Sequence, residues 1–273
     1  MSGLALARER PATHFWRVFF IGGLISYRAL FYWISPWQYI PTMLGAPLFQ
    51  ILFFVYLGRS AGVGSTNFFV VGNSIQICSM AGIFGMTMAI NNERNFQTLS
   101  PILATPSNRL ALFLGRGLPV VISGLQTCVF GFLVSALLLG FRPSAPELPG
   151  LALAVLVTTA SCTGFGMALG SIGLRVRDVW LISNIAYFTV LLVCGVEVPL
   201  RQLPLVVRAL AQVLPLTHGI EAGRMLAAGH SFGSALPDIL LELLVGTVWA
   251  AVAYLLFIQF ERQGRRSGAF DRL

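Results

Sequence analysis

The sequence contains no lysine, and all 18 of its basic residues are arginines. A P-loop ATPase needs a lysine on the nucleotide phosphates, and Schiff-base chemistry needs a lysine amine. Neither activity can reside in this chain. Acidic residues are also few, at 10 in 273, and they form no paired-carboxylate or Ser–His–Asp arrangement. We therefore predict no catalytic residues and no enzyme activity.

Residues that bind metals or form disulfides are equally sparse. The four cysteines lie in four different apolar segments without C-x-x-C spacing, and the three histidines are isolated. Disulfide frameworks and zinc sites need closer groupings, so we predict no disulfide and no metal site. No basic patch with interleaved aromatics stands outside the apolar segments, which argues against nucleic acid as a partner.

Charge is scarce as well. Charged residues make up 10% of the chain, against about 25% in a typical soluble protein. Hydrophobic residues reach 56%, and the mean hydropathy is +0.79. These values predict an all-α membrane protein that is surrounded by lipid, with residues 1–273 forming one transmembrane domain.

Six apolar segments are long enough to be transmembrane helices. They cover residues 38–57, 68–90, 117–140, 151–173, 179–198 and 239–258. In the fourth, Gly166 and Gly170 form a small-xxx-small step that predicts close helix packing. Ahead of all six, residues 14–34 are rich in aromatics, and Arg17 and Arg28 lie about three helical turns apart on one face. We predict an interfacial amphipathic helix there, with a partly inserted helix as the alternative.

The arginine distribution predicts the orientation. With the N-terminus inside, thirteen of the 18 arginines fall in cytoplasmic segments. This bias favours a multi-pass protein of the plasma membrane with both termini in the cytoplasm. The connection 199–238 is then external. In it, Pro204 can open one short helix and Thr217 can cap a second, which Gly229 can end, so we predict a short external helical hairpin before the last span.

The cytoplasmic connection 91–116 holds the most informative pattern. Its matching positions are Glu93, Arg94, Thr98, Leu99, Ile102, Leu103, Thr105 and Pro106. From the pattern alone, a short helix and an ordinary solvated loop fit equally well. The pattern resembles E-R-x-x-G-T-L-E-x-L-L-x-T-P in the permease subunits of ABC-2-type ATP-binding-cassette transporters, with Gln97 and Ser100 in place of Gly and Glu. In that family a short helix here touches the ATPase, so the resemblance implies that these residues form an ATPase-coupling helix.

A second resemblance to the same family lies in the external connection. The family often reads N-P-L-T-x-x-x-E-A-x-R-x-L-x-x-G. The matching residues are Pro215, Leu216, Thr217, Glu221, Ala222, Arg224, Leu226 and Gly229, with Leu214 in place of the Asn. The two motifs stand in the family's order and on opposite sides of the membrane, so the resemblance covers nearly the whole chain.

The resemblance implies a permease subunit that forms a substrate pathway as a homodimer or heterodimer. A separate cytoplasmic ATPase subunit would bind ATP and magnesium, and this chain would bind no cofactor. Family members export drugs, lipids and polysaccharides. We expect a drug or another amphiphile, and hence a link to antibiotic resistance, with a lipid or polysaccharide as the alternative. An ATPase-independent secondary transporter is a further alternative, although the intramembrane charges typical of that class are scarce.

Four polar residues are candidates for the substrate pathway: Glu197, Glu242, Asn73 and Gln76. Ionisable groups near apolar spans are costly and often functional. We expect both carboxylates near the outer ends of their helices, where they reach water, so a plain interface role is the alternative. For the two amides the alternative is hydrogen bonding between helices.

Overall fold

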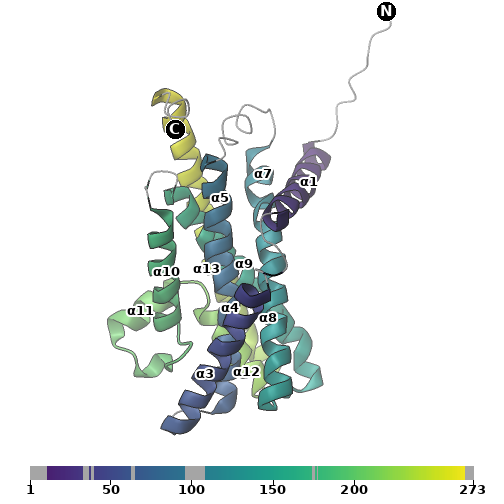
Figure 1. Ribbon diagram of the computed structural model, residues 1–273, viewed down its shortest axis with the longest axis vertical. Coiled ribbons are helices and arrows are strands. Elements are labelled where there is room, and N and C mark those ends of the chain that lie inside the picture. The colour runs from purple at the N-terminus through teal and green to yellow at the C-terminus, as the bar shows by residue number, and fades with distance from the viewer. Residues whose placement is uncertain are drawn as a thin grey trace, which may run out of the picture.

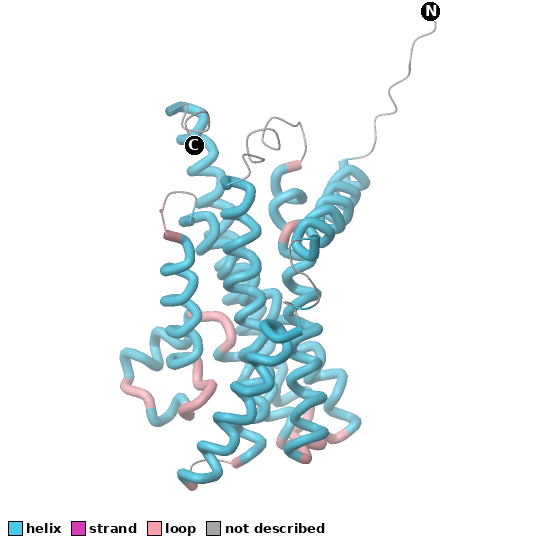
Figure 2. Tube along the Cα trace, viewed as in Figure 1, coloured by secondary structure: helices cyan, strands magenta, loops and turns pink. Residues whose placement is uncertain are grey.

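The computed structural model describes residues 11–32, 37, 40–62, 65–95, 108–173, 176 and 178–267. The α-helices are α1 (Pro11–Tyr32), α3 (Ala46–Ala61), α4 (Thr66–Met80), α5 (Met86–Asn95), α7 (Arg109–Gly115), α8 (Gly117–Leu139), α9 (Leu148–Gly173), α10 (Val179–Val193), α11 (Leu205–Val213), α12 (Thr217–Ala227) and α13 (Phe232–Ser267). The other elements are the π-helices η1 (Ile40–Gly45) and η2 (Ala81–Gly85), and the 3-10 helices η3 (Ala145–Glu147) and η4 (Leu200–Gln202). Helix makes up nearly all of the described chain, with no strand in that part (Figure 2), which confirms the all-α prediction.

Four helical segments in the described part are long and apolar enough to cross a membrane. They are Thr66–Asn92, Leu110–Leu139, Ala145–Gly173 and Phe232–Phe260. The other two predicted spans, 38–57 and 179–198, contain shorter helices: α3 has 16 residues and α10 has 15. At 1.5 Å per residue, each covers roughly 24 Å of the roughly 30 Å that a bilayer requires. Helix length therefore confirms four of the predicted spans and not the full set of six.

The end of α5, where the first motif begins, and the two short helices at the second motif lie toward opposite ends of the bundle. In Figure 1 the long helices run along the vertical axis, and α1, α7 and the C-terminal ends of α5 and α13 lie at the upper end. The α11 and α12 helices lie toward the opposite end. The two short helices α11 and α12 lie within the connection where a hairpin was predicted, and they lie away from the end of the bundle where α5 ends.

The first helix packs across the upper end of the bundle. It covers Pro11–Tyr32, close to the predicted 14–34, and it crosses α7 where two glycines meet. A Cβ atom on Gly23 would lie 3.0 Å from the Gly115 carbonyl oxygen, so only small residues allow this backbone approach. Trp16 and Phe20 are exposed on the helix, which gives it an aromatic outer face.

Helix α9 forms the centre of the bundle, and its glycines explain why. Gly166 is so close to the Gly82 carbonyl of η2 that a Cβ atom could not fit between them. A Cβ on Gly164 would lie 3.0 Å from the Gly246 carbonyl of α13, and one on Gly170 would lie 2.7 Å from Ile90 of α5. In membranes, small residues of this kind let helices approach closely. The predicted packing role of the glycine step is thus confirmed.

Candidate functional site

Three carboxamide side chains form a buried polar group between α3 and α4, which we call the amide cluster: Gln50, Asn73 and Gln76. The Gln50 Nε2 donates to Asn73 Oδ1 at 3.2 Å and to Gln76 Oε1 at 2.8 Å. Asn73 and Gln76 are fully buried, while Gln50 is half-buried. Hydrogen bonding between helices, the alternative for these two amides, is therefore what this structure shows. It also brings both predicted pathway amides to one place.

Glu197 follows α10 and faces the same region. Both of its carboxylate oxygens are buried, so the prediction that this carboxylate reaches water was wrong. Neither oxygen accepts a hydrogen bond from the described part of the chain. Asn73 and Arg224 are close enough to act on its charge. Burying a carboxylate without hydrogen bonds costs free energy, and a ligand that donates hydrogen bonds to it would recover part of that cost. A carboxylate that already accepts hydrogen bonds at a helix end offers no such gain.

Arg224 connects α12 to two neighbouring elements. Its Nη1 donates to the Gly195 carbonyl at 2.7 Å, and its Nη2 donates to the carbonyls of Val196 at 2.9 Å and Phe68 at 3.3 Å. The guanidinium carbon also lies 3.5 Å from the centre of the Phe68 ring, which is cation–π geometry. This arginine therefore holds the second motif to the start of α4 and to the turn after α10.

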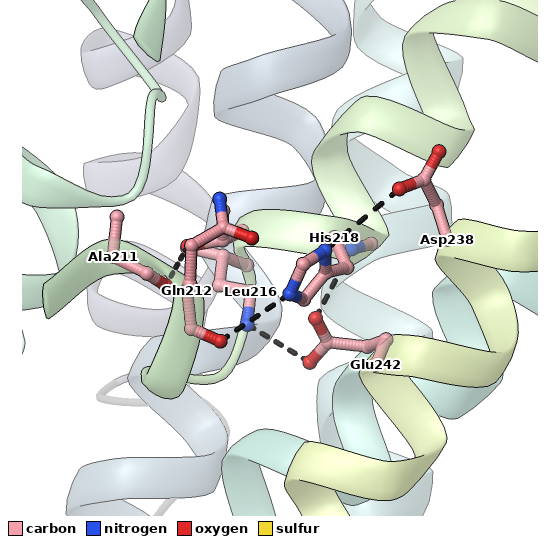
Figure 3. Close-up of polar contacts among 8 residues, drawn as sticks. Ala211, Gln212, Leu216, His218, Asp238 and Glu242 are labelled. Carbon is pink, nitrogen blue, oxygen red and sulfur yellow. Dashed lines mark hydrogen bonds and ion pairs between the residues drawn. The ribbon is translucent and has the colours of Figure 1, made fainter. Parts of the chain in front are cut away.

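Glu242 on α13 caps the N-terminus of α12 (Figure 3). Its two oxygens accept the backbone N–H groups of Leu216 at 2.9 Å and Gly219 at 3.1 Å. A helix begins with unpaired N–H groups and a partial positive charge, both of which a carboxylate satisfies. Glu242 is 0% exposed. The prediction that this carboxylate reaches water was wrong, because the helix end it caps lies inside the protein.

Thr217 does not cap α12, which corrects a second prediction. Its hydroxyl donates to the Ala211 carbonyl of α11 at 2.7 Å, and the cap comes instead from Glu242. The preceding Leu216 has a φ of 92° and a fully buried side chain. A positive φ is strained in a residue with a Cβ, so the surrounding contacts must hold this turn in place.

The rest of the second motif seats and ends α12. Any side chain on Gly219 would collide with Thr158 of α9, and one on Gly223 would collide with Ile75 of α4. At the far end Gly229 has a φ of 84°, and the His230 N–H donates to the Met225 carbonyl at 3.0 Å. This is a Schellman ending, which confirms the predicted role of Gly229. Pro215 and Glu221 lie in the same segment, immediately before α12 and within it.

The first motif falls mostly outside the described residues. Glu93 and Arg94 belong to the last turn of α5. The remaining positions of the predicted coupling helix lie outside the described part of the chain: Thr98, Leu99, Ile102, Leu103, Thr105 and Pro106.

Sequence reasoning missed three residues of these polar sites. Gln50 could not be recognised as a site residue from the sequence, because a single amide in an apolar segment belongs to no motif. His218 was treated only as a metal ligand, yet its ring lies between α11 and α13. Trp249 was not noticed, and its Nε1 donates to the Val213 carbonyl at 2.9 Å, joining α13 to the end of α11. Each contact depends on elements distant in the sequence, which spacing alone cannot reveal.

Comparison with known proteins gives one clear finding. A protein-family model described as ABC-2 type transporter matches residues 18–227. The match begins in α1 and ends with α12, so it includes the amide cluster, the central helix α9, the first motif and all of the second motif except Gly229. A search of the curated proteins finds no significant match.

Proposed function

This chain belongs to the ABC-2 type transporter family, and from that premise we propose that it is the pathway-forming subunit of an ABC exporter driven by a separate ATPase. The observation that carries the proposal is the family match over residues 18–227. The absence of lysine supports it, since the chain has no means to build a P-loop of its own. ATP and magnesium would therefore bind to the cytoplasmic partner.

The direct test is assembly. The tagged chain, expressed together with the ABC ATPase encoded nearest to it, is expected to co-purify with that subunit and to support ATP-dependent uptake of substrate into inverted vesicles. Transport by the chain alone, driven by an ion gradient, would favour a secondary transporter instead.

We further propose that α3, α10 and the four long helices together make six spans, with both termini in the cytoplasm. The arginine bias supports this orientation. The π-helix η1 precedes α3 directly, so the helical stretch from residue 40 to residue 61 is longer than α3 itself. Two copies of this chain, or this chain and a related one, would enclose the pathway.

The topology predicts a labelling pattern. In a cysteine-free background, a cysteine at Ser231 is expected to react with a membrane-impermeant thiol reagent added to intact cells, because the turn after α12 would face outside. A cysteine at Ser107 is expected to react only after the cells are opened. Labelling of Ser107 in intact cells would contradict the proposed orientation.

We propose that the amide cluster and Glu197 line part of the substrate pathway. The cluster supplies polar atoms inside an otherwise apolar bundle, and the Glu197 carboxylate lacks hydrogen bonds from the described part of the chain. Such a surface suits an amphiphile with a polar or cationic group, which supports a drug over a polysaccharide as the cargo. We do not place Glu242 in the pathway, because both of its carboxylate oxygens accept backbone N–H groups at the start of α12.

The Glu197 proposal predicts a change in selectivity. Replacing Glu197 by Gln removes the charge and keeps the shape, so export of cationic amphiphiles is expected to fall on the order of tenfold while export of neutral ones stays near wild type. Transport of matched cationic and neutral dyes into inverted vesicles measures this. Glu147→Gln, at the outer end before α9, is the control and should leave both rates unchanged. Equal effects of Glu197→Gln on both dyes would leave Glu197 as an interface residue.

A further inference from the structure

The corner between α11 and α12 lies near the middle of the long membrane-spanning helices. Gly219, in the first turn of α12, is so close to Thr158 of α9 that a Cβ atom could not fit between them. Thr158 is close to the midpoint of the 29-residue span that contains α9. Trp249, close to the midpoint of the 29-residue span in α13, donates to the Val213 carbonyl at the end of α11. Because the middle of a span lies near the middle of the bilayer, this corner lies inside the hydrocarbon region.

The backbone groups at the corner are bonded to side chains of the protein. The Thr217 hydroxyl donates to the Ala211 carbonyl at 2.7 Å, and the Cys194 thiol donates to the Pro215 carbonyl at 3.5 Å. Two N–H groups of the corner donate to Glu242. Water can satisfy the free groups at a helix end, whereas non-helical backbone at membrane depth needs protein partners. The bonding of the corner therefore agrees with its depth.

Helix α11 extends from this corner to the side of the bundle, where it packs against α10 (Figure 1). Four large apolar residues on one face of it, Leu205, Val206, Leu210 and Val213, are 77%, 80%, 45% and 57% exposed. They share this face because residues 205, 209 and 213, and residues 206 and 210, follow the four-residue spacing of a helix. Ala211 is the one buried residue of α11. A face of this composition favours contact with hydrocarbon over contact with water.

Positive charge lies at the start of α11. The Arg208 Nη2 donates to the carbonyls of Arg201 at 3.2 Å and Leu203 at 3.4 Å, so this guanidinium is directed back toward η4. Arg201 belongs to η4 and is exposed. No acidic residue occurs between positions 198 and 220, so the segment itself does not neutralise these two charges. Arginines beside an exposed apolar face are typical of helices that bind anionic lipid.

We propose that η4 and α11 form a binding surface for an anionic phospholipid. The acyl chains contact the exposed apolar face of α11, and the phosphate binds the Arg201 guanidinium, with Arg208 adding to the positive charge. The corner at Val213 holds one end of α11 deep in the bilayer, while the arginine side chains extend to the headgroups. With the orientation proposed above, the lipid belongs to the outer leaflet.

The charge of this surface favours a lipid over a second copy of the chain. Contact between the α11 helices of two copies would bring arginines of both copies together, and like charges at an interface are unfavourable. An anionic lipid supplies the opposite charge and the acyl chains at once. The lipid contact requires neither a transported substrate nor an ATPase, so it can be tested independently of transport.

Fluorescence quenching of the full-length chain in lipid nanodiscs tests the acyl-chain contact. In the cysteine-free background, Val206→Cys carries an environment-sensitive fluorophore at an exposed position. Phospholipid with a nitroxide on its acyl chain is expected to quench most of the emission, and iodide in the water is expected to quench little of it. Ser231→Cys, in the exposed turn after α12, is the matched control and should show the reverse pattern. Strong quenching of position 206 by iodide would overturn the proposal, as would protection from both quenchers, which would indicate a protein partner.

The same label tests the headgroup. With the nitroxide carried by phosphatidylglycerol, quenching at position 206 is expected to be at least about twofold stronger than with phosphatidylcholine at the same fraction. Arg201→Gln should make the two lipids equal. Arg142→Gln is the control, since Arg142 is exposed in the turn after α8, and it should keep the difference. Equal quenching by the two lipids with both arginines intact, or a full difference in Arg201→Gln, would overturn the proposed phosphate contact.

Discussion

A permease in which Leu99 and Leu103 are both replaced by Asp is expected to lose its ATPase. The family resemblance implies that the segment from Glu93 to Pro106 is the mechanical contact with that subunit, and these leucines would give a short helix there an apolar face that presses into a groove. Burying one leucine contributes about 1.5–3 kcal/mol. Replacing both with charged residues should therefore weaken docking well over tenfold.

The measurement is co-purification with the cognate ATPase, followed by stimulation of ATP hydrolysis in liposomes. The Asp variant should still insert and dimerise, because the long helices are untouched. A double Leu→Met variant at the same two positions is the control, since methionine keeps the apolar surface and should preserve docking. If the Asp variant assembles with the ATPase and stimulates it normally, the ATPase must contact another surface of the permease. The next surface to test would then be α1.

The second large effect concerns the crossing of α9 and η2. Replacing Gly166 by Ala inserts a methyl group where α9 touches the Gly82 carbonyl, and backbone on both sides leaves no flexible side chain to move aside. Overpacking of this kind typically costs about 1–3 kcal/mol. We expect the apparent Tm in detergent to fall by roughly 5–10 °C.

A matched glycine provides the control for Gly166. Gly233 lies in the first turn of α13, and a Cβ atom there would meet nothing within 4 Å. Gly233→Ala should therefore leave the Tm unchanged or raise it slightly, since alanine is the better helix former. Equal Tm values for the two variants would show that the α9–η2 crossing is looser than described.

The sequence was most informative where the physics is local. Apolar runs located the helices, because a membrane span must bury its backbone polar groups within a continuous helix. Gly229 ends α12 as predicted, since only the nearby chain is involved in such an ending. The small-xxx-small step was also sufficient to identify α9 as a packing helix.

What the sequence could not show depends on partners distant along the chain. The cap of α12 was assigned to Thr217, the nearest hydroxyl, but a carboxylate 25 positions later reaches the same N–H groups from α13. Gln50 joins the amide cluster only because α3 and α4 pack side by side. The length of α10 was overestimated because apolar composition continues past Val193, where the α-helix ends. α3 begins at Ala46, later than predicted, because the π-helix η1 precedes it.

The π-helix η2 has a geometric consequence for the second span. A π-turn holds more residues than an α-turn, so the chain on either side is out of phase with a continuous α-helix. Removing one residue from Ala81–Gly85 would let this wide turn close to an ordinary α-turn, so α5 would keep nearly its present face toward α9. Ile90 would then stay packed against Gly170, whereas removing a residue from the regular helix α5 before Ile90 would rotate Ile90 by about 100° away from α9. The extra residue of η2 thus sets the two halves of this span in separate phases, with the amide cluster on one half and the contact of Ile90 with α9 on the other.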